Sequence, residues 1–407
     1  MPSEQEALVD RLGRYPVARY PVQHATTQFH LGAVLLHAGH PAAARDALAV
    51  AREVFDGAGM RLERAKAATM LGVALRETGR LPEAAEAFRE AATEFAALTQ
   101  PVEGAAASYN LGLVCRDRGD IEGAHAAWTR ARALFLDAGH PARAAAAARD
   151  YGASLLTSGD VTAALLLLQE AATLAERAGD LPGLGAAANA VGLAHLAADD
   201  ALAAVEAFRR AVGAFPRTVH PAEYAMAKAN LALAHDRWDQ PAHARLAARQ
   251  ALATPAAARP VRSLARDVLR RMPAGSPEDL LVVLDAEDPQ RRPAVLREEV
   301  VRLGDVPAAE RCDVIRVFLD GLLTRPGSSY ELAASLLGVL LELPPVRFAE
   351  VIAAVVQGTG DRAEADADRV RAVVGSALAR FPIPQWQRVA ATLNESARAA
   401  GQPAVWR

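Results

Sequence analysis

The amino-acid sequence predicts an all-α fold: an α-solenoid of helix-turn-helix repeats followed by a C-terminal helical domain. The first observation behind this prediction is a step from a large residue to a small one that recurs with a period of about 40 residues. The second is that apolar residues keep helical spacing after the period ends, as between residues 314 and 323. The recurring steps are Leu31-Gly32, Leu71-Gly72, Leu111-Gly112, Tyr151-Gly152, Val191-Gly192 and Leu231-Ala232.

Three further positions of the repeating row hold nearly constant residue types. Two of them hold alanine in all six rows: Ala44, Ala84, Ala124, Ala164, Ala204, Ala244 and Ala51, Ala91, Ala131, Ala171, Ala211, Ala251. The position between them is bulky until the last row: Leu48, Phe88, Trp128, Leu168, Phe208 and then Ala248. Small residues let helices approach closely, and the bulky residue fills the space that remains. Stacked rows therefore build one continuous core.

Each row is expected to contain two helices, A and B. Helix A begins at a proline in four rows, because proline loses no hydrogen bond at the first helical position: Pro21, Pro101, Pro141 and Pro221. Helix B follows Asp120, Asp160 and Asp200, which can accept from free amides of the first turn. Helix A ends at a glycine that suits a left-handed turn: Gly39, Gly79, Gly119 and Gly159.

The two ends of the array differ from its middle. Ser3 and Glu6 are spaced as a capping box, which predicts a short helix within an N-terminal helix-and-connector segment, residues 1–20. The array itself is expected over 21–273 and closes with a capping helix in 257–272, whose Arg262, Arg266 and Arg270 share one face.

A mixture of Pro, Gly and Ser in 273–280 breaks the period, so we place a boundary there. Residues 274–407 are expected to form six or seven helices, in a bundle or a degenerate helical repeat. Within this region Ser276-Pro277 indicates a helix start, Gly358 a helix end, and Asp361 the next start.

The Leu-Gly step followed by Ala, a bulky residue and Ala resembles the tetratricopeptide repeat (TPR), over roughly residues 21–254. The repeating unit is longer here, about 40 residues against the family's 34, and the family's early Trp and closing Pro are missing. The sequence therefore resembles the longer-repeat kind found in kinesin light chains and bacterial regulators. In this family helix A lines a concave groove that holds a protein or peptide.

The resemblance assigns groove positions to residues two and one before the Leu-Gly step and to residues after it. The candidate binding residues are Phe29, Arg76, Tyr109, Asn110, Arg116, Arg149, Asn189 and Asn230. Guanidinium groups near an aromatic ring and an amide suit a carboxylate or an extended peptide backbone. An alternative stays open: a solvated arginine face with ion pairs inside the array, such as Arg116 with Asp117 or Asp120.

Several function classes lack support in the sequence. The formal net charge is −3, and residues 275–407 carry 15 basic and 19 acidic side chains, so nucleic acid is not an expected partner. No apolar run reaches the ~18 residues of a membrane span. Two cysteines make neither a disulfide framework nor a metal site. No phosphate loop, dinucleotide fingerprint or nucleophile motif occurs, so we expect no cofactor, no metal, no catalytic residues and no enzyme activity.

The sequence thus predicts a cytoplasmic, bacterial, non-catalytic scaffold or adaptor that holds a partner in the groove of its repeats. The partner is a protein or peptide, acidic or with a free C-terminus; homo-oligomerisation stays open. One alternative is a bacterial peptide-sensing regulator with its output through the C-terminal helical region. Another is an accessory protein of a biosynthetic pathway, or a small-molecule binder within one.

Overall fold

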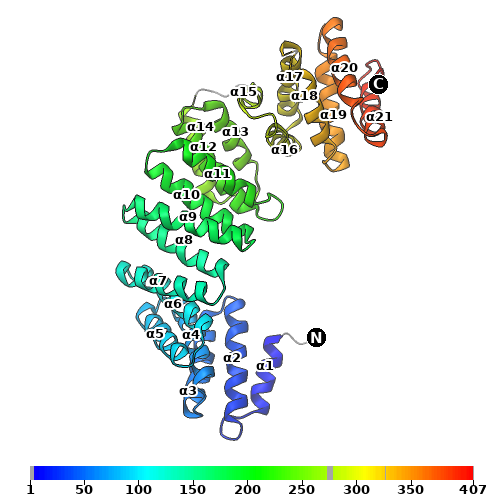
Figure 1. The fold of residues 1–407 in the computed structure, drawn as a ribbon. Coiled ribbons are helices and arrows are strands. Elements are labelled where there is room, and N and C mark those ends of the chain that lie inside the picture. The colour runs from blue at the N-terminus through cyan, green and yellow to red at the C-terminus, as the bar shows by residue number, and fades with distance from the viewer. Residues whose placement is uncertain (1–3, 273–277, 326, 407) are drawn as a thin grey trace. The chain divides into compact units, whose positions relative to one another are not determined.

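The computed structural model describes residues 4–272, 278–325 and 327–406, and every regular element in these ranges is an α-helix (Figure 1). The all-α prediction is confirmed. Ser3 of the expected capping box and the expected helix start at Ser276-Pro277 lie outside the described residues. The chain divides into two compact units, Met1–Asp200 and Ala201–Arg407.

The first unit contains ten helices in its described residues 4–200. After a short first helix, the other nine are equal in length and begin at even intervals along the chain. The helices are α1 (Glu4–Arg14), α2 (Pro21–His37), α3 (Pro41–Gly57), α4 (Arg61–Glu77), α5 (Leu81–Ala97), α6 (Pro101–Asp117), α7 (Ile121–Asp137), α8 (Pro141–Thr157), α9 (Val161–Arg177) and α10 (Leu181–Ala197). We call α2, α4, α6, α8 and α10 the A-helices, and α3, α5, α7 and α9 the B-helices.

Every junction from α2 to α10 is the same three-residue turn. Its middle residue has a positive φ, and the residue after it donates back to the helix, as His40 N does to Leu35 O at 2.8 Å. Seven glycines and Thr99 occupy this position. The sequence predicts this role only for glycines that end A-helices, but Gly59, Gly139 and Gly179 end B-helices in the same way. The additional length of this repeat therefore lies in longer helices and not in longer loops.

The recurring glycine has its explanation in the contact between A and B. A Cβ atom on Gly72 would lie 2.8 Å from Phe88 Cζ, and one on Gly152 would lie 2.7 Å from Leu168 Cγ. Both distances are shorter than side chains tolerate, so only glycine lets the bulky residue of the B-helix reach this point. The two alanine columns are fully buried beside it throughout α3, α5, α7 and α9.

At three of four junctions, successive A-helices of the first unit are more closely spaced than successive B-helices. Contacts join α2 to α4, α4 to α6 and α8 to α10, whereas the backbones of α6 and α8, like those of successive B-helices, approach each other less closely. In a curved two-layer array, the layer whose neighbouring helices are closer together is the inner one. The expected assignment of helix A to the concave side is consistent with this packing.

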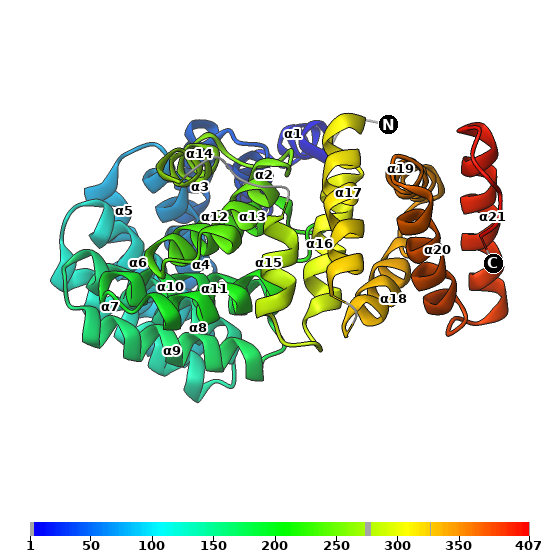
Figure 2. The ribbon, with the colours of Figure 1, turned by 90° about the horizontal axis from the view of Figure 1, so that it is seen from above.

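The second unit begins with further helix pairs and continues into seven helices after residue 277. The described helices are α11 (Ala201–Ala214), α12 (Pro221–Arg237), α13 (Pro241–Leu252), α14 (Arg259–Arg271), α15 (Asp279–Ala286), α16 (Arg292–Leu303), α17 (Ala308–Thr324), α18 (Ser329–Leu340), α19 (Pro345–Gly360), α20 (Glu364–Leu378) and α21 (Ile383–Ala399). From α15 onward each helix contacts the second helix after it: α15, α17, α19 and α21 form one layer, and α16, α18 and α20 the other (Figure 2). This is the pattern of a degenerate helical repeat rather than a bundle.

Two predicted boundaries in this region are wrong. Gly358 does not end a helix but lies inside α19, where a Cβ would come within 3.3 Å of Leu319 Cδ1. Asp361 does not begin a helix but caps the C-terminus of α19, and α20 starts at Glu364. Gly358 thus allows close packing with α17. A rule that takes glycine as the end of a helix does not anticipate this role.

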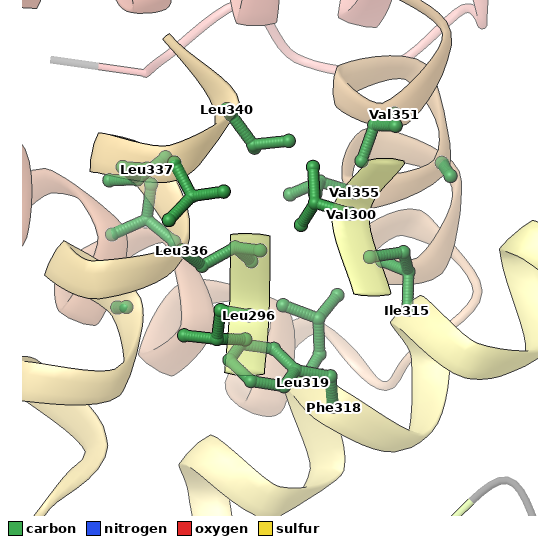
Figure 3. Packing of buried hydrophobic residues seen from close by; sticks show 14 of the residues in the cluster. Leu296, Val300, Ile315, Phe318, Leu319, Leu336, Leu337, Leu340, Val351 and Val355 are labelled. Atoms are coloured by element: carbon green, nitrogen blue, oxygen red, sulfur yellow. The ribbon is translucent and has the colours of Figure 1, made fainter. Parts of the chain in front are cut away.

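One hydrophobic cluster extends through the second unit, from Leu246 of α13 to Trp406. Its centre is formed by Leu296, Val300, Phe318, Leu337 and Val355, whose side chains point toward one another (Figure 3). Ion pairs flank it at the junction with the repeats: Lys228 with Glu298, and Arg245 Nη2 with Asp279 Oδ1 at 2.6 Å. The assignment of residues 274–407 to a domain of their own stays a prediction.

Candidate peptide-binding face

The candidate site lies on the A-helices of the first unit. Arg76 is on α4, Tyr109 and Arg116 are on α6, and Arg149 is on α8. Prolines at the first position of α6 and α8 fix where these helices begin, and the glycine steps fix how they rotate against their B-helices. Arg116 is exposed, and Arg76, Tyr109 and Arg149 are half-buried.

Arg76 and Arg116 meet at one carboxylate, that of Asp117 on α6. Arg76 Nε donates to Asp117 Oδ2 at 2.7 Å, and Arg116 Nη2 donates to Oδ1 at 2.9 Å. Burial alone would raise the pKa of Asp117, but hydrogen bonds from the two guanidinium groups outweigh burial and lower it. The arginine side chains keep 33% and 41% of their surface exposed, so they still have N–H groups that face solvent.

A second carboxylate, that of Asp150 on α8, joins Tyr109 to Arg149. Tyr109 Oη donates to Asp150 Oδ2 at 2.6 Å, and Arg149 Nη2 donates to Oδ1 at 2.9 Å. Burial raises the pKa of Tyr109, and the charge of Asp150 raises it further. Burial lowers the pKa of Arg149, but Asp150 more than compensates and the net change is upward. The phenol is thus a fixed, neutral donor.

The two clusters repeat one geometry along successive A-helices. In each, a side chain of one A-helix donates to an aspartate 41 residues later, on the next A-helix. That aspartate directly follows an arginine that also donates to it. On the same helices, Val73 of α4 and Leu113 of α6 are half-buried. The face defined by Arg76, Arg116, Asp117, Tyr109, Arg149 and Asp150 is called the A-face below.

The other predicted residues are not brought into these clusters. Asn110 donates to Ala106 O of its own helix at 3.0 Å. Phe29 is half-buried on α2 and packs against core residues, with its ring edge-on to that of His30. Asn189 on α10 and Asn230 on α12 are each only 7% exposed, and Asn230 belongs to the second unit.

Asp117 and Asp150 are missing from the candidate binding residues, although Asp150 holds a groove position one before the Tyr151-Gly152 step and Asp117 is expected beside Arg116. A usable signal is present in the sequence, because each aspartate directly follows an arginine within an A-helix, after the glycine step for Asp117 and before it for Asp150. The open alternative, ion pairs inside the array, is realised at Arg116 with Asp117. This ion pair still leaves charge available for a ligand, because two guanidinium groups share the one carboxylate and keep a net positive charge.

Two further features bear on what the site can do. Among the described residues, no group of three His, Cys, Asp or Glu side chains is placed to hold a metal ion. Within the same ranges, none of the helices has both the length and the apolar character that a membrane span requires.

The sequence matches no protein-family model and none of the curated proteins. Among solved structures, the chain is similar to BtubC (BKLC) from P. vanneervenii, with 17% identity and a TM-score of 0.46 over 52% of this chain and 89% of that one. It is also similar to a putative kinesin light chain with nearly identical TPR-like repeats from Podosopora anserina. The identity there is 17% and the TM-score 0.39, over 52% of this chain and 98% of that one. The chain is a repeated helical array, and its structural neighbours include TPR-like repeat proteins.

Proposed function

We propose that the chain is a non-catalytic scaffold that holds an extended segment of a protein partner against the A-face. One observation carries the proposal: side chains of three successive A-helices are fixed to one another by Arg76–Asp117 and Tyr109–Asp150. Groups held in this way lose little conformational entropy on binding, which removes one of the costs of association.

The residual charge of the A-face favours a partner carboxylate. Arg76 and Arg116 share the single charge of Asp117, so a second carboxylate can approach them without displacing the first. A carboxylate side chain or a free C-terminus supplies this group. Val73 and Leu113 are half-buried and lie three residues before Arg76 and Arg116 on the same helices, which favours an apolar residue near the carboxylate.

A comparative capture experiment tests the proposal. The wild-type chain, the variant Arg76→Ala/Arg116→Ala and the control Arg89→Ala/Arg130→Ala are each incubated with bacterial lysate, and retained proteins are quantified by mass spectrometry. Arg89 and Arg130 are exposed residues of the B-helices α5 and α7, so the control removes the same charge from the other layer. We expect at least one protein that wild type and control retain and the A-face variant loses.

Two outcomes oppose the proposal. If all three chains retain the same proteins in equal amounts, the A-face is not the binding surface. If the control loses the partner and the A-face variant keeps it, binding takes place on the B-helices. Melting curves of all three chains are compared first, so that loss of binding is not loss of folding.

A further inference from the structure

The strongest concentration of one charge sign lies on α14, in the second unit. This 13-residue helix carries five arginines and one aspartate, in a chain whose formal net charge is −3. Its inward side is apolar: Ala265 and Val268 are fully buried, and the helix packs against α12 and α13. Apolar contacts therefore hold the inward side of this helix.

Four of these arginines form a stripe on the outward side of α14. Arg262, Arg266 and Arg270 follow one another at four-residue intervals, and Arg259 lies one turn before Arg262. All four are exposed. Residues four apart on a helix are separated by about 6 Å along its axis. We call Arg259, Arg262, Arg266 and Arg270 the α14 arginine stripe.

The stripe is largely unpaired. Arg259 and Arg266 have no acidic partner within 4–272, 278–325 and 327–406, and Arg262 donates to the carbonyl oxygen of Pro255. Only Arg270 pairs with a carboxylate, that of Asp267 on the same helix, and its side chain is still 78% exposed. By contrast, Arg271 beside the stripe is paired with Asp236 of α12 at 2.6 Å. Arg271 thus pairs with another helix, whereas within the described residues no arginine of the stripe pairs with a carboxylate of another helix.

We infer that the α14 arginine stripe is a second docking surface, which binds an acidic helical segment of a partner protein. Carboxylates at four-residue intervals on a helix have the same ~6 Å spacing as the stripe, so each can meet one guanidinium group. The half-buried Leu269 lies beside the stripe and offers an apolar contact for the partner helix.

Charge distribution favours a protein partner over nucleic acid. The stripe is one helix wide, Asp267 lies at its edge, and residues 275–407 carry 15 basic against 19 acidic side chains. A phosphate backbone needs a broader basic surface than one helix presents. This surface belongs to a different unit from the A-face, so the inference does not depend on the proposed function.

The test uses synthetic probes and the full-length chain. One labelled peptide places glutamates at positions i, i+4 and i+8 of an alanine-based helix, and a second has the same composition in scrambled order. Fluorescence anisotropy measures the affinity of each for wild type, for Arg262→Glu/Arg266→Glu, and for the control Arg89→Glu/Arg130→Glu. A labelled DNA duplex is titrated in parallel, and sedimentation reports the oligomeric state.

The inference predicts that wild type binds the patterned peptide on the order of tenfold more tightly than the scrambled one. The stripe variant should lose this preference, the control should keep it, and added salt should weaken it. Equal affinity for the two peptides, or an unchanged stripe variant, would overturn the inference. So would tighter binding of the DNA duplex, or self-association that the stripe variant abolishes, because the occupant would then be nucleic acid or a second copy.

Discussion

At the residue scale, the A-helix glycines Gly32, Gly72, Gly112 and Gly152 are set by contact with the bulky residue of the B-helix that follows. A Cβ on Gly112 would lie 2.6 Å from Trp128 Cδ1, and the indole ring is fully buried with no room to move aside. This requirement opposes helix propensity, which favours alanine over glycine by about 1 kcal/mol. Glycine is retained because the steric cost of any side chain exceeds that gain.

We therefore expect Gly112→Leu to lower the free energy of unfolding by about 1–3 kcal/mol or more. Gly112→Ala should also be destabilising. The matched control is Gly57→Ala at the end of α3, where a Cβ would have no neighbour within 4 Å. That change should be neutral, or stabilising by up to about 1 kcal/mol. Urea unfolding measures all three, and equal effects of the alanine changes at 57 and 112 would contradict the assigned contact.

Trp128 has a buried indole N–H that no described hydrogen-bond acceptor satisfies. Leaving a donor unsatisfied costs about 1–3 kcal/mol, which offsets part of the gain from the larger ring. Phenylalanine occupies the same position in other rows, at Phe88 and Phe208. Trp128→Phe should therefore change stability by no more than about 1 kcal/mol, against about 3–5 kcal/mol lost in Trp128→Ala. A phenylalanine variant as unstable as the alanine variant would show that the N–H has a partner.

At the element scale, the three-residue turn is the unit that keeps the spacing of the helices even. Of the eight turns between α2 and α10, seven have glycine at the left-handed position. The remaining turn has Thr99 there, with a φ of 53°. A left-handed conformation costs a residue other than glycine about 1–2 kcal/mol, and a β-branched side chain adds crowding. The backbone at the junction of α5 and α6 is therefore strained at Thr99.

Thr99→Gly should consequently raise the melting temperature, by an amount that corresponds to about 1 kcal/mol. The reciprocal change Gly119→Thr, at the equivalent position after α6, should lower stability by a similar amount because it introduces the same strain. Differential scanning calorimetry of the two variants measures both effects. A Thr99→Gly variant less stable than wild type would mean that the threonine side chain makes a contact that outweighs the strain.

Two histidines on adjacent helices give the second unit a predicted pH dependence. The ring centroids of His235 on α12 and His243 on α13 are 4.8 Å apart. Burial lowers the pKa of His235 to about 3, and the proximity of His243 acts in the same direction; burial lowers the pKa of His243 to about 4. In the unfolded chain both have a pKa near 6.5, so between pH 6.5 and 3 the unfolded state binds more protons. Stability must then fall as the pH is lowered through this window.

We expect the melting temperature to decline between about pH 6.5 and 4, and to decline less steeply in His243→Gln. The control is His140→Gln, a change at an exposed residue before α8 that should keep the wild-type slope. If the slope of His243→Gln equals that of wild type, the pair does not control the acid response.

Sequence and structure agree best where the repeat is regular. The glycine, alanine and bulky columns locate the A–B contact because each repeats six times or nearly so. The roles of Asp117 and Asp150 as acceptors could not be predicted, because they depend on side chains from the previous repeat, 41 residues earlier. Gly358 misleads because a glycine that serves helix packing has the same local signature as one that ends a helix.

At the scale of the whole molecule, the two units differ in where their charged side chains and ion pairs lie. In the first, Arg–Asp pairs lie at the surface of the A-helices, and Arg76 with Asp117 links two of them. In the second, charged pairs such as Arg302 with Glu299 are buried, and exposed arginines gather on α14. Buried pairs contribute little net stability but are costly to break, whereas exposed arginines remain available to a partner. These exposed arginines are the basis of the two binding surfaces that we propose, the A-face and the α14 arginine stripe.

Selection from a random peptide-display library tests the central claim, that the A-face recognises a carboxylate-bearing extended segment, most directly. The wild-type chain, Arg76→Ala/Arg116→Ala and the control Arg89→Ala/Arg130→Ala are each used as bait, and the enriched sequences are compared. We predict that wild type and control enrich peptides with an acidic residue or a free C-terminus next to an apolar residue, and that the A-face variant does not. Equal enrichment of the same peptides by all three chains, or enrichment without any acidic or C-terminal preference, would contradict the claim.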